Sequence, residues 1–303
     1  MFGRTAAPRG GRGRGPDGVR LPAEVRAVAE AALAAPVRGA RAAGGGSINE
    51  AAVVETDAGA AFAKWHLRAP AGFFEAEADG LSRLAATETV ATPEVLACER
   101  RGDVAVLLLA YHAPGRSGDG AQAEAGRALA LLHRRRGHAP GLERDNYMGA
   151  VPQRNGPASD ERWLTFFRER RLLALSDGLP ARTRRALERL ELGALLTEPE
   201  GGCALLHGDL WGGNLLTTAA GRAVFIDPAV YHGHPEVDLA MTRLFGGFTG
   251  RFYDAYQEVA GRFDRGLYER LEVLNLYPLL IHVRLFGGGY LGQVEATLAR
   301  YGG

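Results

Sequence analysis

Short runs of apolar positions in the first third of the chain predict a small sheet. Four short apolar stretches bounded by turn residues are typical of strands, at residues 51–54, 60–65, 94–97 and 104–109. The first two are separated by the turn Thr56–Gly59 and predict an antiparallel hairpin, with Lys64 near the end of its second strand. An alanine-rich segment at 24–35 has helical spacing and ends near Pro36.

The helix predicted over residues 73–86 carries a charge on its apolar stripe. Phe73, Leu81 and Leu84 recur at helical spacing, and Glu77 lies among them. A buried carboxylate costs several kcal/mol unless it is paired, so we expect a partner in Lys64, the only lysine of the chain. Such a pair can place an ammonium against phosphate oxygens. The alternative is that Glu77 lies at the edge of the stripe and is solvated.

Beyond Pro114-Gly115 the spacing becomes mainly helical. Helices are predicted at 122–135, 160–175, 182–192, 249–259 and 267–285, with a strand-rich insert at 204–227. The expected fold class is α+β, with a small N-terminal lobe of sheet and helix followed by a larger, mainly helical lobe. We place the small lobe at residues 23–111 and the large lobe at 112–303.

A glycine-rich segment inside the insert contains candidate chemistry. Leu215-Leu216 and Val224–Ile226 flank a turn and predict a hairpin, and the residues that bracket it, Asn214 and Asp227, would lie about 5 Å apart. One carboxamide and one carboxylate suit a Mg²⁺ ion that is completed by phosphate oxygens and water. Asp209, five residues before Asn214 on the same loop, is available for proton transfer.

Other interpretations of these segments stay open at this point. Asp and Asn in glycine-rich loops are often turn residues. Two carboxylates can also form a glycosidase pair, although neither the glycines nor Lys64 would have a role there. The segment Tyr231–Asp238 contains a His-x-His pattern that superficially resembles a zinc site, but it lacks softer ligands. A second glycine-rich segment, 44–49, precedes the hairpin and could bring backbone N–H groups close to phosphate.

Composition narrows the class of protein. The 303 residues include 36 basic and 35 acidic side chains, so we expect no specific nucleic-acid partner and no membrane. Cys98 and Cys203 are too few for a disulfide framework, and a cytoplasmic location is expected. No apolar stretch approaches the length of a membrane span. Residues 1–22 are rich in Gly, Arg and Pro and predict a disordered tail, with a weak RNA contact as the alternative.

Taken together, these residues resemble the fructosamine kinase (ketosamine-3-kinase) family, in the aminoglycoside-phosphotransferase and choline-kinase branch of the protein-kinase-like fold. The resemblance runs from about residue 43 to residue 301. Its most specific motif is Leu-His-Gly-Asp-Leu-Trp-Gly-Gly-Asn at 206–214. Shorter segments that look like this family are 74–77, 146–149, 152–155, 233–236 and 244–248.

The resemblance implies a bilobal kinase whose residues 23–111 bind nucleotide and whose residues 112–303 carry catalysis and substrate binding. Lys64 would contact the α and β phosphates of ATP, with Glu77 orienting it. Asp209 would be the catalytic base. Asn214 and Asp227 would be the Mg²⁺ ligands.

The resemblance also implies further contacts around the nucleotide and the acceptor. Backbone groups at Gly45, Gly46 and Ser47 would lie over the phosphates, and Tyr111 would lie beside adenine. Trp211 has a flat apolar face that could cover a sugar; the alternative is that it anchors the loop or the core.

The implied activity is the ATP- and Mg²⁺-dependent phosphorylation of the 3-hydroxyl of ketosamines, either small molecules or protein-linked, which is a deglycation repair reaction. An aminoglycoside or other amino-sugar phosphotransferase is the alternative among enzymes. From other classes, the alternatives are a catalytically inactive nucleotide-binding pseudokinase or an RNA-binding protein that uses the Arg-rich tail. Intact Lys64, Asp209 and Asp227 argue against the loss of catalysis.

Overall fold

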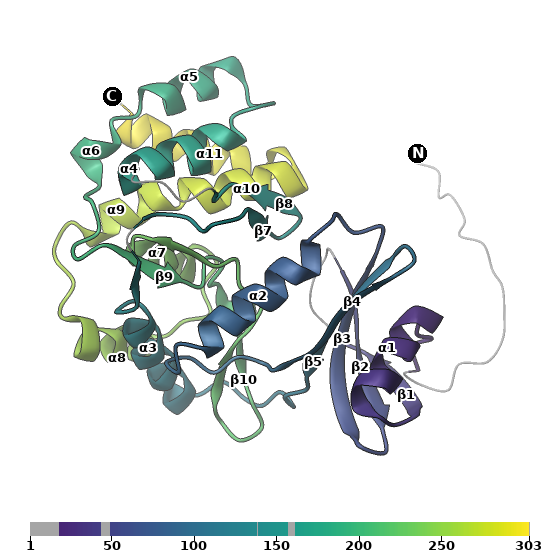
Figure 1. The fold of residues 1–303 in the computed structure, drawn as a ribbon. Coiled ribbons are helices and arrows are strands. Elements are labelled where there is room, and N and C mark those ends of the chain that lie inside the picture. Colours follow the sequence, from purple (N-terminus) through teal and green to yellow (C-terminus); the bar gives the residue numbers. More distant parts are fainter. Residues whose placement is uncertain (1–17, 44–48, 138, 157–160, 303) are drawn as a thin grey trace, which may run out of the picture.

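The computed structural model describes residues 18–43, 49–137, 139–156 and 161–302. In this part of the chain the N-terminal elements are α1 (Ala23–Leu33), β1 (Val37–Ala42), β2 (Glu50–Thr56), β3 (Gly59–Leu67), α2 (Phe73–Ala85), β4 (Val95–Arg101) and β5 (Val104–Ala110). The five strands form one antiparallel sheet in the order β1-β2-β3-β5-β4. Figure 1 shows this sheet beside the mainly helical remainder of the molecule.

The larger lobe combines helices with short strands. Its elements are α3 (Asp119–Leu132), β6 (Arg136–Gly137), β7 (Asn146–Met148), β8 (Val151–Gln153), α4 (Trp163–Phe166), α5 (Ala181–Arg189), α6 (Leu192–Leu195), β9 (Cys203–Leu206), β10 (Leu215–Thr217), β11 (Ala223–Phe225), β12 (Tyr231–Gly233), α7 (Glu236–Leu244), α8 (Gly250–Ala260), α9 (Leu267–Leu274), α10 (Leu276–Phe286) and α11 (Leu291–Tyr301). A π-helical turn, Phe167–Leu172, continues α4. The α+β, two-lobed architecture predicted from the sequence is confirmed.

Strand β5 shows how the small lobe builds two hydrophobic layers. Side chains alternate between the two faces of a sheet. Val106 and Leu108 pack in the cluster that contains α1, whereas Leu107 and Leu109 pack in the cluster that contains α2. The two helices therefore cover opposite faces of the sheet. A strand that is buried on both sides is apolar at every position, which explains its uninterrupted run of apolar residues.

The same alternation decides where Lys64 points. In β3, Ala61 and Ala63 belong to the α1 cluster, and Phe62 packs against the α2 cluster. Lys64 lies two residues after Phe62 and therefore shares the face that α2 covers. Figure 1 shows α2 running from this sheet toward the larger lobe. Lys64 Nζ lies 3.1 Å from Asp227 Oδ1 of that lobe, so the lysine lies where the lobes meet.

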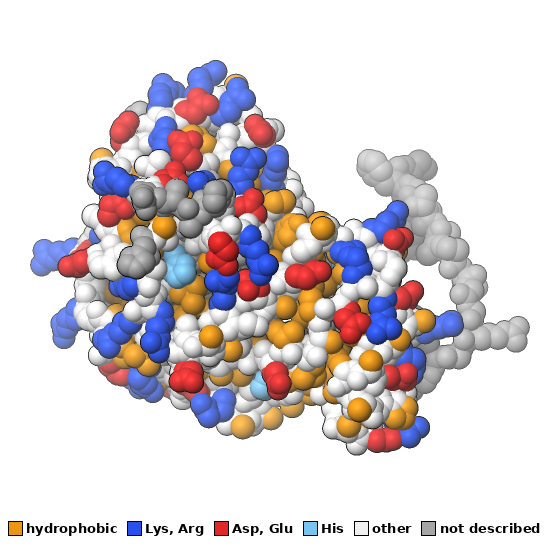
Figure 2. Space-filling model, in the orientation of Figure 1, with side chains coloured by type: hydrophobic (Ala, Val, Ile, Leu, Met, Phe, Trp, Pro, Cys, Tyr) orange, Lys and Arg blue, Asp and Glu red, His pale blue; other side chains and the backbone are white. Residues whose placement is uncertain are grey.

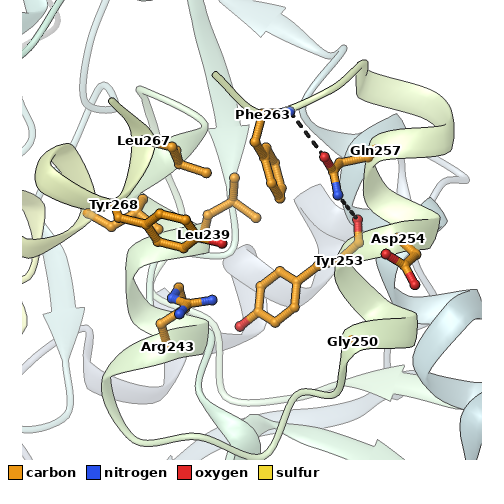
Figure 3. A pocket seen from close by; sticks show the side chains of 10 residues that line it. Leu239, Arg243, Gly250, Tyr253, Asp254, Gln257, Phe263, Leu267 and Tyr268 are labelled. Atoms are coloured by element: carbon orange, nitrogen blue, oxygen red, sulfur yellow. Dashed lines mark hydrogen bonds between the residues drawn. The ribbon is translucent and has the colours of Figure 1, made fainter. Parts of the chain in front are cut away.

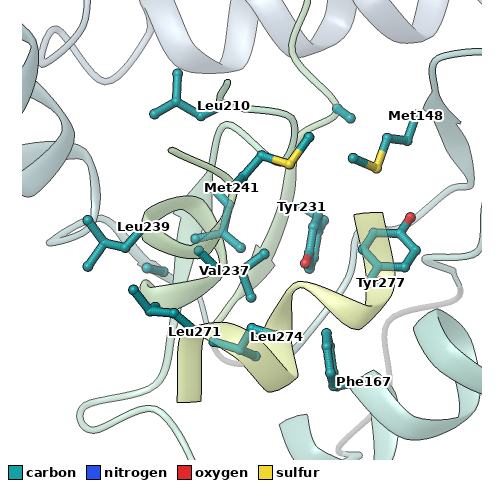
Figure 4. Packing of buried hydrophobic residues seen from close by; sticks show 14 of the residues in the cluster. Met148, Phe167, Leu210, Tyr231, Val237, Leu239, Met241, Leu271, Leu274 and Tyr277 are labelled. Carbon is teal, nitrogen blue, oxygen red and sulfur yellow. The ribbon is translucent and has the colours of Figure 1, made fainter. Parts of the chain in front are cut away.

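The core of the larger lobe surrounds the strands that lead into the glycine-rich segment. Strand β9 pairs with β12 on one side and β6 on the other. Figure 4 shows Tyr231 and Tyr277 in the middle of this core, near Phe167 and Leu274. Tyr231 and Phe167 are completely buried. In Figure 2, positive and negative side chains are interspersed over the visible face, in line with the nearly balanced charge.

Some predicted elements differ from the structure. The helix predicted at 267–285 is divided into α9 and α10 at Asn275. Pro278 has no N–H to donate to the carbonyl of Leu274, and its ring crowds that carbonyl, so one continuous helix cannot form. Elements that the sequence pattern did not predict include β1, the β7–β8 hairpin, α7 and α11. The predicted helix at 160–175 begins at Trp163, since residues 161 and 162 are not helical, and residue 160 lies outside the described residues.

The predicted tail ends earlier than residue 22. Residues 1–17 lie outside the described residues. Beyond them, the Val19 N–H donates to the Ala40 carbonyl at 3.0 Å, and Leu21 is buried against the α1 cluster. Burial of this leucine joins the last residues of the segment to the small lobe. Within the described ranges, no helix combines the length and the apolar character needed to cross a bilayer.

Candidate active site

The cleft between the lobes brings together all the described residues that the sequence analysis assigns to a site. It is a cavity of about 650 Å³. The assigned residues that line it are Lys64, Glu77, Tyr111, Asp209, Trp211, Asn214 and Asp227. Gly45, Gly46 and Ser47 of the glycine-rich loop lie outside the described residues, although Ala43 and Asn49 on either side of that loop line the cavity.

Lys64 links the two lobes through a pair of carboxylates. Its Nζ lies 2.8 and 2.9 Å from the Glu77 carboxylate oxygens and 3.1 Å from Asp227 Oδ1. The Lys64 and Glu77 side chains are 8% and 13% exposed, so the predicted buried pair is present and the solvated alternative for Glu77 is wrong. Burial disfavours the ammonium, but Glu77 and Asp227 outweigh it and raise the pKa of Lys64.

The β10–β11 hairpin brings Asn214 and Asp227 together with a register that differs from the prediction. Asn214 lies opposite Ile226, whose N–H donates to the Asn214 carbonyl at 3.1 Å. Asp227 is therefore one residue past the position that directly faces Asn214. Its backbone has φ 54°, a left-handed conformation that is rare outside glycine.

The oxygen atoms available as metal ligands at this hairpin suit a hard divalent cation. The Asn214 amide nitrogen donates to the Asp209 carbonyl at 2.8 Å and to the Asp209 carboxylate at 3.2 Å. This orientation leaves Asn214 Oδ1 without a hydrogen bond from the described residues. The Asp227 side chain is 41% exposed at the cleft. One carboxamide oxygen and one accessible carboxylate, with space for phosphate oxygens and water, suit Mg²⁺.

Asp209 has an unusual protonation equilibrium. Burial raises the pKa of this carboxyl to about 8, and the nearby negative charge of Asp227 adds to the rise, against the hydrogen bond from Asn214 and the charge of Lys64. A carboxyl with this pKa can exchange a proton near neutral pH, which is what a general base must do. Cations that enter the cleft would favour its charged form.

A buried acid holds the loop that carries Asp209. Asp238 accepts hydrogen bonds from the N–H groups of His207 at 2.8 Å and Gly208 at 2.9 Å, and it lies 3.1 Å from His133 Nε2. Burial opposes its charge, but these partners outweigh burial and lower the pKa of Asp238. Gly208 has φ 82°, and a Cβ there would lie 2.0 Å from the Ala229 carbonyl oxygen, so only glycine fits.

Aromatic side chains line another part of the cleft. We refer to Trp211, His282, Phe286 and Tyr290 as the acceptor wall. Trp211 is 40% exposed, so it is not a core residue, and its ring lies so close to Gly213 that a Cβ there would be 2.3 Å from it. The His282 ring is 4.9 Å from the Tyr290 ring and 5.5 Å from the Phe286 ring, centre to centre.

Three of these aromatic residues were not identified from the sequence. His282 and Phe286 are four residues apart on α10 and therefore share a helix face. That spacing was the available signal, but only the packing of α10 beside the glycine-rich segment makes it part of the cleft. The contact of His282 Nδ1 with the Pro278 carbonyl, at 2.8 Å, requires the proton on Nδ1 in the neutral ring. Nε2 is then an acceptor.

Tyr111 also lines the cleft. It follows β5 and is half-buried, and its hydroxyl accepts a hydrogen bond from Arg41 at 2.6 Å. The Arg41 guanidinium also lies 5.2 Å from the centre of the Tyr111 ring. The connection between the lobes therefore carries an aromatic ring at the cavity wall. A role for this ring beside adenine stays a prediction.

The remaining candidate segments do not join this cleft. His234 is mostly buried, stacks 5.1 Å from Trp163 and accepts a hydrogen bond from the Glu236 N–H at the start of α7. Within the described ranges, no three His, Cys, Asp or Glu side chains gather as a metal site. A smaller cavity of about 370 Å³ lies between α7, α8 and α9, with Arg243 between Tyr253 and Tyr268 (Figure 3). None of the predicted site residues lines it.

Comparison with known proteins identifies the family. The model of the fructosamine kinase family matches residues 23–301. The chain belongs to the fructosamine kinase family. Among curated relatives of this family, a probable ketoamine kinase of Enterococcus faecium is 37% identical over 265 residues, which cover 85% of this chain and 93% of that protein. The resemblance found in the sequence is thereby confirmed, and the glycosidase alternative is excluded.

Solved structures agree with the family and with the fold. A crystal structure assigned as a fructosamine-3-kinase of Thermobifida fusca has a TM-score of 0.80 at 32% identity, covering 92% of this chain and 98% of that chain. An aminoglycoside phosphotransferase in complex with ADP and hygromycin B has a TM-score of 0.58 at 15% identity, covering 92% and 99%. The fold is protein-kinase-like, and the protein is an ATP-dependent phosphotransferase.

Proposed function

We propose that this protein transfers the γ-phosphoryl group of ATP to the 3-hydroxyl of a ketosamine. One observation carries the proposal. In a fructosamine kinase family chain, a single cleft joins the charged cluster of Lys64, Asp209 and Asp227 to an aromatic acceptor wall. The first part suits the handling of phosphates and a proton, and the second suits a sugar that bears an amine.

Each charged residue has a specific task in this scheme. Lys64 binds phosphate oxygens, and Glu77 orients its ammonium. Asp209 accepts the proton of the acceptor hydroxyl as the new P–O bond forms, while the bond between the γ-phosphorus and its bridging oxygen breaks and ADP leaves. Asn214 and Asp227 hold Mg²⁺, which neutralises phosphate charge when it is bound. A Mg²⁺ ion held at Asn214 and Asp227 would favour the charged form of the nearby Asp209, which is the form that accepts a proton.

The acceptor wall favours a ketosamine over an aminoglycoside. A secondary ammonium can lie over the rings of Trp211 or Tyr290, and the Nε2 of His282 can accept a hydrogen bond from a hydroxyl or the ammonium. An aminoglycoside carries several positive charges, which need several carboxylates. The described carboxylates that line the cleft are Glu77, Asp209 and Asp227, and all three have tasks at the phosphates or in proton transfer.

The test is a screen of acceptors in the presence of Mg²⁺ and ATP. Ribulose-, erythrulose- and fructose-derived amines should consume ATP, and NMR of the product should place the phosphate on the third carbon. Kanamycin and hygromycin B serve as polycationic comparators and should be poor acceptors. Phosphorylation of an aminoglycoside without transfer to any ketosamine would overturn the proposal. So would transfer to a different hydroxyl of the ketosamine.

A further inference from the structure

A buried polar network beneath the Asp227 segment has no role in the site described so far. Its members are Asn146, Gln153, Asn155, Arg171 and Tyr277, each no more than 6% exposed. They come from β7, β8, the segment after β8, the π-helical turn and α10. Two of the family-like segments of the sequence, 146–149 and 152–155, supply three of them. We call these five residues the amide network.

Arg171 lies at the buried end of the network. The side chain is completely buried, and its guanidinium lies 4.5, 4.1 and 5.3 Å from the ring centres of Phe166, Tyr231 and Tyr277. Its hydrogen-bond acceptors among the described residues include the Arg154 carbonyl and the Asn155 amide oxygen, at 2.6 Å. Ring faces and amide oxygens thus surround the positive charge.

The hydrogen bonds that lead away from Arg171 all point in one direction. Arg171 donates to Asn155 Oδ1, Asn155 Nδ2 donates to Asn146 Oδ1 at 2.6 Å, and Asn146 Nδ2 donates to the Val230 carbonyl at 2.8 Å. Each donor faces away from the cation, so the guanidinium polarises both amides in the same sense. Aligned hydrogen bonds of this kind strengthen one another in a low-dielectric interior.

A second branch ends beside the first. The Tyr277 hydroxyl donates to Gln153 Oε1 at 2.8 Å, and Gln153 Nε2 donates to the Ala229 carbonyl at 3.1 Å and to Asn146 Oδ1 at 2.7 Å. The network therefore holds two consecutive backbone carbonyls, Ala229 and Val230. On the other side of the segment, the Ala229 N–H donates to the His207 carbonyl at 2.9 Å. The backbone at 229–230 is fixed from both sides.

This fixed backbone begins two residues after Asp227. Asp227 has a left-handed φ of 54° and precedes Pro228, whose ring restricts the conformations of the residue before it. A non-glycine residue keeps such a conformation only when its surroundings enforce it, and such strain is concentrated at functional sites. Lys64 holds the side chain of Asp227 from the small lobe, and the amide network holds the backbone that follows from the large lobe.

We propose that the amide network is a positioning device for Asp227: it fixes the 229–230 backbone and thereby presents the Asp227 carboxylate to the divalent cation. The proposal rests on the proposed function, in which Asp227 is a metal ligand. The five residues of the amide network are positioning residues, because they act on the cation only through the 227–230 segment. Removing one donor from the network should weaken the binding of the cation without changing the acceptor site.

The experiment measures metal binding directly. Gln153→Met has almost the volume of the native side chain but cannot donate to Ala229 or accept from Tyr277. The dissociation constant of Mn²⁺ from the enzyme–ADP complex is read from the EPR signal of free Mn²⁺, with enzyme in excess over ADP. Gln153→Met should raise this constant by about tenfold or more, the usual effect of losing a partner behind a metal ligand. The KM of the ketosamine should stay within about twofold of wild type.

Three further variants make the outcome decisive. Tyr277→Phe keeps the ring beside Arg171, removes one hydroxyl and should weaken Mn²⁺ by about two- to fivefold, so it tests the network if Gln153→Met fails to fold. Thr183→Val removes a buried hydroxyl that donates to Glu295 at 2.7 Å, between α5 and α11; it should lose stability but not Mn²⁺ affinity. Asp227→Asn tests the metal site itself.

The outcomes separate the two proposals. If Asp227→Asn weakens Mn²⁺ but Gln153→Met and Tyr277→Phe do not, the positioning role is wrong and the metal site stands. If Asp227→Asn leaves the Mn²⁺ constant unchanged, the metal assignment fails and the positioning role fails with it. If Thr183→Val weakens Mn²⁺ as much as Gln153→Met does, the effect reflects general loss of stability and overturns the positioning role.

Discussion

The two ends of the cleft differ in the side chains that line them, which are charged at one end and aromatic at the other. At the phosphate end, the Lys64 ammonium lies within 3.1 Å of carboxylate oxygens of both Glu77 and Asp227. At the acceptor end, the aromatic side chains of Trp211 and Phe286 are 40% and 53% exposed. Charges in a cleft need their partners, so the first cluster tolerates little change. Exposed rings can be exchanged at lower cost, so the acceptor end can change substrate while the chemistry is kept.

The largest expected effect on turnover concerns Asp209, the proposed general base. Asp209→Asn should lower turnover by at least ~10², because the general base is lost while the shape of the side chain is kept. Binding of ADP, measured by calorimetry, should change by less than about twofold, because this carboxylate does not hold the nucleotide. A variant that retains more than a tenth of the wild-type turnover would remove Asp209 from proton transfer.

The next effect tests the phosphate end. Lys64→Met and Lys64→Arg should both lower kcat/KM for ATP by about tenfold or more, because the planar guanidinium does not replace a compact ammonium between two carboxylates. Circular dichroism should show that both variants are folded. The KM for the ketosamine is the internal control and should barely change. Full activity of Lys64→Arg would show that charge alone, and not its geometry, is what the cluster requires.

A smaller effect is expected at the acceptor end. Trp211→Ala should raise the KM of the ketosamine by about tenfold, because the variant loses the apolar contact between the indole face and the sugar. The KM of ATP should stay unchanged. Tyr268→Ala is the matched control, because Tyr268 is an exposed aromatic residue that lines the other cavity. Equal effects of Trp211→Ala on both KM values would contradict the division of the cleft into two ends.

The smallest effect is a pH dependence of stability. Because the pKa of Asp209 is about 8 in the folded protein and about 4 in an unfolded chain, the folded state binds more protons between these values. Stability from this group is complete below about pH 4 and is lost as the pH rises through 8. Asp209→Asn lacks this loss. Calorimetry without nucleotide should show that the Tm of Asp209→Asn minus that of wild type rises by about 2 °C or more between pH 5 and pH 8.5. A Tm difference that stays constant over this range would contradict the raised pKa of Asp209.

The phosphate end could be predicted from the sequence because its signals are local. Helical spacing placed Glu77 on a buried stripe, and the need to pair this buried charge pointed to Lys64 on the preceding hairpin. The hairpin also brought Asn214 near Asp227. The predicted register of this hairpin was wrong by one residue, because apolar patterns identify strands but do not show where the first hydrogen-bonded pair forms.

Apart from Trp211, the acceptor wall could not be predicted in this way, and neither could the amide network. His282 and Phe286 enter the cleft only through the packing of α10 against distant segments. Gln153 ends the short strand β8 and Asn155 follows it, and polar residues at such positions are expected in exposed turns from the sequence alone. Their burial follows from contacts with Arg171 and with the 229–230 backbone, which are 15 or more residues away along the chain. Only the folded structure reveals such contacts.

The environment of Lys64 also bears on the chemistry that produces ketosamines. Reducing sugars condense with amines in their neutral form, and the side chains most often modified are lysines. This chain has a single lysine, buried between two carboxylates that raise its pKa, so its amine is neither accessible nor neutral. The folded enzyme should therefore form no sugar adduct at Lys64 during prolonged incubation with ribose, as peptide mass spectrometry can verify. The one lysine of the chain is thereby shielded from the reaction that produces ketosamines.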